Sequence, residues 1–241
     1  MGSNQGYGQY CPLAMASTLL GNRWTLLLIR EFMEGSTSFN DLARGLPLMS
    51  RSLLKRRLQE LEDNRLITHR PGPRGKSGEY RLTPAGEDLT KVIFQMATWG
   101  QEWIDEEPSL RDIDGRFLIW DMGRNVNPTD FLPNPFTVHF IFEDAPEEIR
   151  EHWLVFEQNE VDACYIDPGK DVDVFVETDL RTMTRVWMGW CSLEAAVRDG
   201  DMVVTGQPLY IDRMREWLGL SSLASTQKRP VTQRIGQALS Q

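Results

Sequence analysis

The stretch from Ser50 to Thr83 constrains the fold of this chain more than any other. It holds a basic amphipathic segment, SRSLLKRRLQELED, and then two short extended segments that flank a tip rich in glycine, proline and cations, PGPRGKSG. Leu54, Leu58 and Leu61 step by four and three residues, so on a helix they form one apolar stripe that would face the core. A helix that can enter a DNA groove, followed by a cationic hairpin, predicts a winged helix-turn-helix.

The charge of the chain is divided unevenly. The net charge is −9 over 241 residues, yet residues 1–104 carry 13 Lys and Arg against 10 Asp and Glu. Residues 105–241 carry 13 against 25, whereas Arg44 to Arg81 carry 10 against 4. A basic patch and an acidic remainder predict two domains with different partners. The predicted division is a DNA-binding and dimerisation domain at 1–104, a linker at 105–111, a ligand-binding domain at 112–220 and a mobile tail at 221–241.

Several function classes receive no support from composition or motifs. No apolar run approaches the roughly 18–20 residues that span a bilayer, and the first residues do not read as a secretory signal. Three widely spaced cysteines without a Cys-x-x-Cys pair favour reduced thiols in a cytoplasm. Scattered histidines and the lack of nucleophile-elbow, phosphate-loop or His-Glu-x-x-His motifs predict no metal, no cofactor and no enzyme.

The first part of the chain is predicted to be mostly helical. Helix starts are expected at Pro12, after the caps Ser38 and Ser50, and after Thr83. The expected elements are helices at Pro12 to Leu20, Trp24 to Met33, Ser38 to Arg44, Arg51 to about Asn64 and Pro84 to Trp103, with extended segments at Ile67 to Arg70 and Glu79 to Thr83. The last helix is long enough to leave an apolar face for a partner subunit.

The second part of the chain is predicted to be an α+β domain. Val172, Val174 and Val176 alternate with acidic residues, as in a half-buried strand. The expected strands are 137–143, 153–157, 163–167, 172–177 and 202–205, and the expected helices are 180–190, 193–198 and 208–218.

Many spaced positions of the first hundred residues resemble the HxlR family of winged-helix regulators, relatives of the MarR type. The matching elements are Cys11-Pro12, Gly21-x-x-Trp24, Gly35, Phe39-x-x-Leu42, Leu46-Pro47-x-x-Ser50, Leu54-x-x-x-Leu58-x-x-Leu61-Glu62, Leu66-Ile67 and Tyr80-x-Leu82-Thr83-Pro84-x-Gly86. The resemblance implies a dimer that binds an operator, with the helix that begins at Ser50 in the major groove. Arg65 departs from the family's usual glycine. Either Asn64 adopts the left-handed conformation there, or Arg65 does so at a cost of about 1 kcal/mol.

Cations in the Ser50 helix and the hairpin tip are the candidate DNA contacts. Helix-turn-helix proteins read base edges with the N-terminal residues of this helix, and Arg or Lys can pair with guanine. A flexible cationic tip can follow a phosphate backbone. The candidates are Ser50, Arg51, Ser52, Lys55 and Arg56 on the helix and Arg74 and Lys76 at the tip; Arg57 fits either a phosphate or a neighbouring acid. The alternative is a solvated cationic surface.

Cys11 directly precedes Pro12 and is the predicted N-cap of the first helix. A helix N-terminus lowers the pKa of a thiol and makes it more reactive. In several relatives of the HxlR type, a cysteine at this position senses oxidants or electrophiles. Because no second cysteine lies nearby in sequence, the alternative is a structural thiol.

The second part resembles a sterol carrier protein type two domain. The resemblance is carried by the order of strands and helices and by Gly189-x-x-Ser192-Leu193-x-x-Ala196-x-x-x-Gly200-x-x-x-x-x-Gly206. It implies an antiparallel sheet with helices around an apolar cavity for a lipid or similar ligand. Trp187, Met188 and Trp190, beside Gly189, are the candidate ligand-binding residues, and core packing is the alternative for each.

Together these features predict a cytoplasmic, homodimeric transcription regulator. Its partners would be a double-stranded DNA operator and an apolar small-molecule effector. The alternative is a redox-sensing regulator that acts through Cys11, with a structural C-terminal domain.

Overall fold

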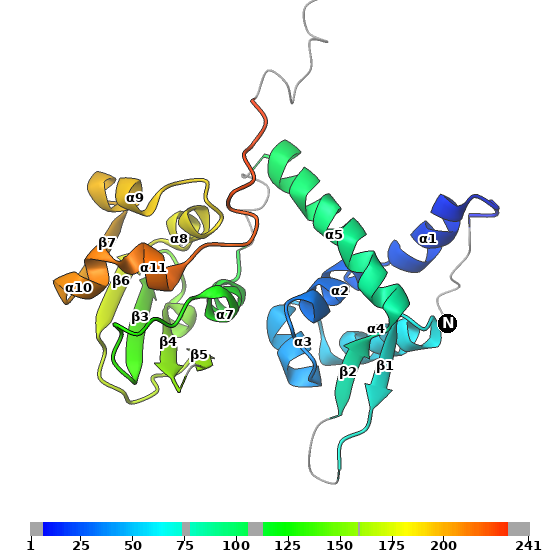
Figure 1. The fold of residues 1–241 in the computed structure, drawn as a ribbon, viewed down its shortest axis with the longest axis horizontal. Coiled ribbons are helices and arrows are strands. Elements are labelled where there is room, and N and C mark those ends of the chain that lie inside the picture. The colour runs from blue at the N-terminus through cyan, green and yellow to red at the C-terminus, as the bar shows by residue number, and fades with distance from the viewer. Residues whose placement is uncertain (1–6, 74–77, 106–112, 159, 231–241) are drawn as a thin grey trace, which may run out of the picture. The chain divides into compact units, whose positions relative to one another are not determined.

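The computed structural model describes residues 7–73, 78–105, 113–158 and 160–230. The chain divides into two compact units, Met1–Met96 and Ala97–Gln241. The division falls within helix α5 (Pro84–Trp103), which Figure 1 draws as one continuous helix. Most of the predicted linker, 106–111, lies outside the described residues, as does the end of the predicted tail. Each unit is described by itself.

The first unit, the winged unit, follows the predicted order of elements. Its helices are α1 (Pro12–Leu20), α2 (Thr25–Met33), α3 (Phe39–Gly45), α4 (Arg51–Asp63) and the beginning of α5, and its strands are β1 (Ile67–Arg70) and β2 (Glu79–Leu82). All three predicted polar caps are confirmed. Ser38 and Ser50 accept hydrogen bonds from the backbone of α3 and α4, and Thr83 Oγ1 accepts one from the amide of Gly86 at 3.2 Å. Each cap satisfies a helix donor that has no partner within the helix.

The hairpin and the helices share one apolar core. β1 and β2 pair antiparallel, from Ile67 opposite Leu82 to Arg70 opposite Glu79 (Figure 1). The predicted stripe on α4 is buried in this core, together with Leu28 of α2 and Leu42 of α3; its members are Leu54, Leu58 and Leu61. This packing turns the opposite side of α4 outward.

At the end of α4, Arg65 and not Asn64 adopts the left-handed conformation. Arg65 adopts a left-handed conformation with φ 59°, whereas Asn64 has φ −87°. The amide of Leu66 bonds to the carbonyl of Leu61, and the amide of Arg65 bonds to that of Glu62, both at 2.9 Å. These two bonds make a Schellman motif, and buried Leu61 and Leu66 supply its apolar contact.

The second unit, the C-terminal unit, combines a sheet with helices. Its elements are α7 (Gly115–Asn125), β3 (Phe136–Phe142), the 3-10 turn η1 (Glu147–Ile149), β4 (Glu151–Glu157), β5 (Glu160–Cys164), β6 (Val174–Thr178), α8 (Leu180–Trp187), α9 (Leu193–Asp199), β7 (Met202–Gly206), α10 (Pro208–Asp212) and α11 (Met214–Leu218). The predicted strands and helices are all found, with β5 a few residues earlier than predicted. The helix predicted at 208–218 is two short helices, and α7 was not predicted.

The sheet corrects one prediction. In the described part of the chain its strand order is β5-β4-β3-β6-β7. β3, β4 and β5 form an antiparallel meander, but β6 pairs with β3 in parallel, from Val138 opposite Val174 to Phe142 opposite Thr178. The sheet is therefore mixed rather than antiparallel. Because β4 occupies one edge of β3, β6 pairs along the other edge. The long connection after β5 lets β6 run in the same direction as β3.

One face of this sheet carries the core of the C-terminal unit. Phe136, Val138, Phe140 and Phe142 alternate along β3 and are all fully buried. They pack with apolar residues of α7, α8 and α11, including Trp187 and Trp217. Alternate residues of a strand lie on one face, so the opposite face receives His139, which stacks on Trp153 with ring centroids 4.5 Å apart.

Candidate nucleic-acid interface and ligand pocket

The outward side of α4 gathers the predicted helix contacts. Ser50 Oγ accepts a hydrogen bond from the Leu53 amide at 3.3 Å and so holds the first turn. The predicted contacts on the next two turns are all exposed: Arg51, Ser52, Lys55 and Arg56. Because the leucine stripe binds the helix to the core, this cationic side is presented to solvent. The arrangement is that of a helix available to a DNA groove.

Neighbouring side chains orient the arginines of α4. Arg51 Nη1 donates to Asn40 Oδ1 at 3.2 Å, and Arg56 forms a loose ion pair with Glu60 at 3.8 Å. Arg57 also pairs with Glu60, and its side chain is only 12% exposed. Of the two roles open to Arg57, the structure therefore favours the pair with a neighbouring acid.

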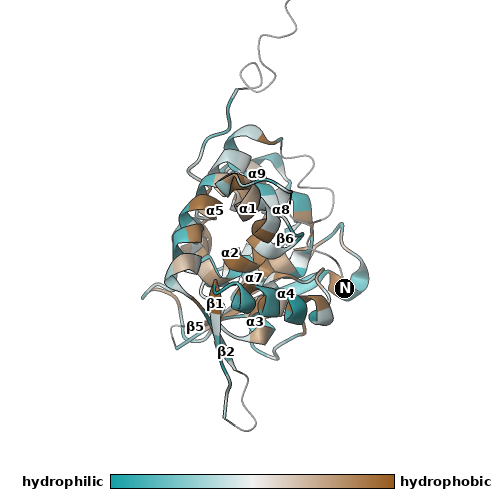
Figure 2. Cartoon of the chain, turned by 90° about the vertical axis from the view of Figure 1, so that its right-hand side faces the viewer, coloured by the Kyte–Doolittle hydropathy of each residue, from teal (hydrophilic) through white to brown (hydrophobic). Residues whose placement is uncertain are grey.

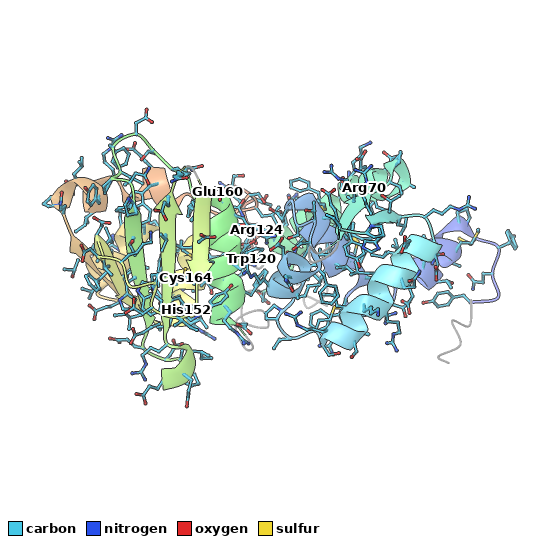
Figure 3. The ribbon with its side chains drawn as sticks, turned by 90° about the horizontal axis from the view of Figure 1, so that it is seen from below. Arg70, Trp120, Arg124, His152, Glu160 and Cys164 are labelled. Atoms are coloured by element: carbon cyan, nitrogen blue, oxygen red, sulfur yellow. The ribbon has the colours of Figure 1, made fainter. Side chains whose placement is uncertain are left out.

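The hairpin carries a further candidate DNA contact. Arg74 and Lys76 lie outside the described residues. Arg70, which the sequence prediction missed, is exposed at the end of β1, on the arm that leads to the tip (Figure 3). Its signal was its place directly before the Pro-Gly-Pro of the tip. On the facing strand, a hydrogen bond from Arg81 lowers the pKa of Glu79 below its ordinary value.

Close packing holds the two arms of the hairpin together. The rings of His69 and Tyr80 stack with centroids 4.2 Å apart. A Cβ on Gly78 would lie 2.3 Å from His69 Nε2, so only glycine fits beside that ring. The base of the wing is therefore well defined where it leads to the cationic tip.

Helix α1 presents a thiol and apolar side chains. Cys11 is the N-cap of α1, as predicted, and is exposed. No disulfide joins any cysteine of the described residues. Leu13 and Met15 are 74% and 65% exposed. On α5, Val92 and Met96 are also exposed, and Figure 2 shows apolar positions among the polar ones along that helix.

The predicted ligand-binding residues lie beside a pocket but do not line it. Trp187 is buried in the core, where its indole N–H donates to Asp121 Oδ2 at 2.8 Å. Met188 is half-buried against the same core, and the Lys228 ammonium lies 4.8 Å from the centroid of the Trp190 ring. The neighbours of these residues, Val186, Gly189 and Cys191, do line a pocket of about 360 Å³.

This pocket, here the tail pocket, is lined on one side by the segment after α11. Its lining also includes Leu193, Leu218, Leu220, Ala224, Ser225 and the guanidinium-bearing Arg215. Leu220 precedes, and Ala224 and Ser225 belong to, the segment from Ser221 onward that the sequence predicts to be a mobile tail. In the structure, the Ser221 amide donates to the Trp187 carbonyl at 2.9 Å.

Other polar residues of the C-terminal unit have structural roles. Asp173 Oδ2 accepts from the Thr137 amide at 2.9 Å and joins β6 to β3. His152 of β4 is 1% exposed beside α7, which carries Trp120 and Arg124 (Figure 3). Burial lowers the pKa of His152 to about 4.

The described residues also bear on metals and membranes. They contain no group of three or more His, Cys, Asp or Glu that could hold a metal ion. No helix formed by them is long and apolar enough to cross a membrane.

Known proteins match the winged unit. The model of the HxlR-like helix-turn-helix family matches residues 19–108. The HTH-type transcriptional regulator sll1512 of Synechocystis sp. is 32% identical over 101 residues, which cover 42% of this chain and 75% of that protein. The HTH-type transcriptional regulator YodB of Bacillus subtilis is 32% identical over 97 residues, 39% of this chain and 87% of that one. The structure of reduced YodB is 30% identical, covers 40% of this chain and 97% of its own, and has a TM-score of 0.36.

Proposed function

The chain belongs to the HxlR-like helix-turn-helix family of DNA-binding transcription regulators, and we propose that it is a ligand-responsive member that binds its operator as a homodimer. The observation that carries the DNA interface is the exposed cationic side of α4. Arg51, Ser52, Lys55 and Arg56 enter the major groove, and Ser50 lies at the phosphate backbone. Each Arg or Lys that pairs with guanine contributes about 1–3 kcal/mol of discrimination. Arg74 and Lys76 follow the backbone from the wing tip.

The homodimer is supported by apolar side chains that α1 and α5 present to solvent. Leu13 and Met15 of α1 and Val92 and Met96 of α5 are exposed in the single chain. Burying such side chains contributes about 25 cal/mol per Å² of apolar area. A two-fold dimer places its recognition helices in half-sites about 34–36 Å apart.

The effector response is supported by the second unit and by α5. The sterol-carrier-like interpretation of the C-terminal unit predicts a ligand site, and the tail pocket offers one. Helix α5 begins in the winged unit and ends in the C-terminal unit. An effector that binds one state of this helix better than another shifts operator affinity, typically by about 1–3 kcal/mol.

To test the DNA interface, the full chain is first used to select its binding sequence from a random DNA library. Variants are then compared in their binding to that sequence. Arg51→Gln and Arg56→Gln should relax the base preference and weaken binding in fluorescence anisotropy by about tenfold or more each. Lys91→Gln, an exposed cation on α5, is the matched control and should leave binding unchanged. Equal effects at all three positions would refute the assignment to α4.

Binding to the same selected DNA, together with the particle mass in solution, tests whether the protein is a homodimer. Met96→Glu should convert a two-chain particle into a one-chain particle in light scattering and abolish cooperative operator binding. Gln95→Glu, the exposed neighbour, is the control. A wild-type chain that is monomeric on and off DNA would contradict the dimer.

Redox sensing through Cys11 is the second candidate. The observation in its favour is the exposed thiol at the N-cap of α1, which is open to an oxidant in solvent. Diamide should then release the protein from its operator, and Cys11→Ser should prevent the release. Equal operator binding by both proteins, with and without diamide, would exclude this candidate.

A further inference from the structure

The tail pocket has the size and lining of a small-molecule site. Its volume of about 360 Å³ lies at the lower end of the range of about 300–1,000 Å³ for ligand pockets. Val186, Leu193, Leu218, Leu220 and Ala224 supply most of its side-chain lining. Such a lining suits a short hydrocarbon chain rather than a sugar or a nucleotide.

Among the described residues, one charged group lines the pocket. Arg215, on α11, belongs to the lining, and its Nη1 lies 3.2 Å from Glu194 Oε1. Both side chains of this ion pair are mostly exposed, at 64% and 59%. An exposed ion pair contributes little to stability, so an incoming anion can replace Glu194 as the partner of the guanidinium. A planar guanidinium pairs well with a carboxylate through two parallel hydrogen bonds.

The wall of the pocket depends on a close approach of the tail. A Cβ on Gly189 would lie 2.6 Å from the carbonyl oxygen of Ala224, and Gly189 also has a φ of 71°. Glycine therefore allows the tail to lie directly over the end of α8. The pocket is built by residues far apart in the sequence.

The tail segment that lines the pocket also forms hydrogen bonds with the end of α5. Lys228 Nζ donates to the Ile104 carbonyl at 2.6 Å, and the Arg229 amide donates to the Glu102 carbonyl at 2.9 Å. A molecule that moves Ala224 or Ser225 thus acts on a segment bonded to the C-terminal end of that helix.

We propose that the tail pocket binds an amphiphile with a carboxylate head and a medium-length acyl chain. The chain lies against Leu193 and Leu218, and the carboxylate pairs with Arg215. This inference rests on the proposed ligand response and names the chemistry of its ligand.

Three probes with the same hydrocarbon chain test the head group. Decanoate, 1-decanol and decyltrimethylammonium are titrated into the full chain below their micelle concentrations, with calorimetry as the readout. Decanoate should bind most tightly. Arg215→Gln should weaken decanoate by about tenfold without affecting 1-decanol, and Glu194→Gln should strengthen it. Arg213→Gln removes a nearby cation that does not line the pocket and should have no effect.

Cys191 supplies a second readout because it also lines the pocket. Saturating decanoate should slow its modification by N-ethylmaleimide about tenfold or more, read by peptide mass spectrometry. Cys11, exposed on α1, is the internal control and should react at its usual rate. Decanoate that binds no better than decyltrimethylammonium, or that leaves Cys191 unprotected, would overturn the proposal.

Operator affinity measured on the same samples separates this proposal from the proposed function. Decanoate that protects Cys191 without changing operator affinity supports the pocket and contradicts the ligand response. Operator binding in a protein whose Cys191 is unprotected supports the DNA-binding function and overturns the pocket.

Discussion

Gln101 donates its side-chain amide to the main-chain carbonyl of Met188 at 3.2 Å, which ties the last turns of α5 to the end of α8. Gln101 is 5% exposed. The helix that starts as part of the winged unit thus ends as part of the C-terminal unit. This bond and those made by Lys228 and Arg229 give α5 its fixed partners in that unit.

Gln101→Leu should destabilise the C-terminal unit by about 1 kcal/mol, because it removes the donor of the part-buried hydrogen bond to the Met188 carbonyl. Urea unfolding followed by tryptophan fluorescence measures the loss, since Trp24 is the only tryptophan of the chain outside this unit. Gln95→Leu, on the exposed side of α5, is the control. Equal midpoints for the two variants would contradict the assigned role.

Arg65→Gly should stabilise the winged unit by about 1 kcal/mol, because glycine adopts φ 59° without the steric cost of a Cβ. The corresponding rise in melting temperature, about 4 °C or more for a unit of this size, is measurable by calorimetry. Asn64→Gly makes the same change one residue earlier, where φ is −87°, and should lower stability. If Asn64→Gly raised the stability and Arg65→Gly did not, the conclusion that Arg65 is strained would be wrong.

Acid should destabilise the C-terminal unit through His152. Burial lowers the pKa of His152 from 6.5 to about 4, so the unfolded chain binds the proton more readily. The contribution is fully present above pH 6.5 and is lost as the pH falls towards 4, with about 1.4 kcal/mol lost by pH 5.5. His152→Phe keeps an aromatic ring beside Phe142 and should flatten this dependence in urea unfolding between pH 7.5 and 5.5. An equally steep dependence in the variant would assign the effect to other groups.

Arg74 and Lys76 should together steepen the salt dependence of operator binding. Each phosphate contact adds about 0.9 to the slope of log K against log salt, so Arg74→Gln with Lys76→Gln should reduce the slope by about 1.8. The base preference should persist, since phosphate contacts carry no direct sequence information. Anisotropy titrations across salt concentrations measure both quantities. A slope equal to that of the parent chain would remove the wing tip from the interface.

Local chemistry made much of the winged unit predictable. Ser38, Ser50 and Thr83 cap helices through bonds to amides a few residues away, so a short sequence window is enough to recognise them. The C-terminal unit offered weaker signals. Helix α7 was missed because Gly115 and Gly123 lower its propensity, while a Cβ on Gly123 would lie only 3.2 Å from a Leu154 methyl group. That close approach is invisible in sequence.

The sequence by itself determined the helix caps, the leucine stripe of α4 and the cationic side opposite it, because spacing along one helix decides which residues share a face. Only the tertiary structure decided between Asn64 and Arg65 at the end of α4, placed β6 parallel to β3, and turned the Trp187 indole to Asp121. It also lined a pocket with residues of the segment that the sequence predicts to be a mobile tail. These outcomes depend on contacts between distant segments, whose partners no local pattern of residues specifies.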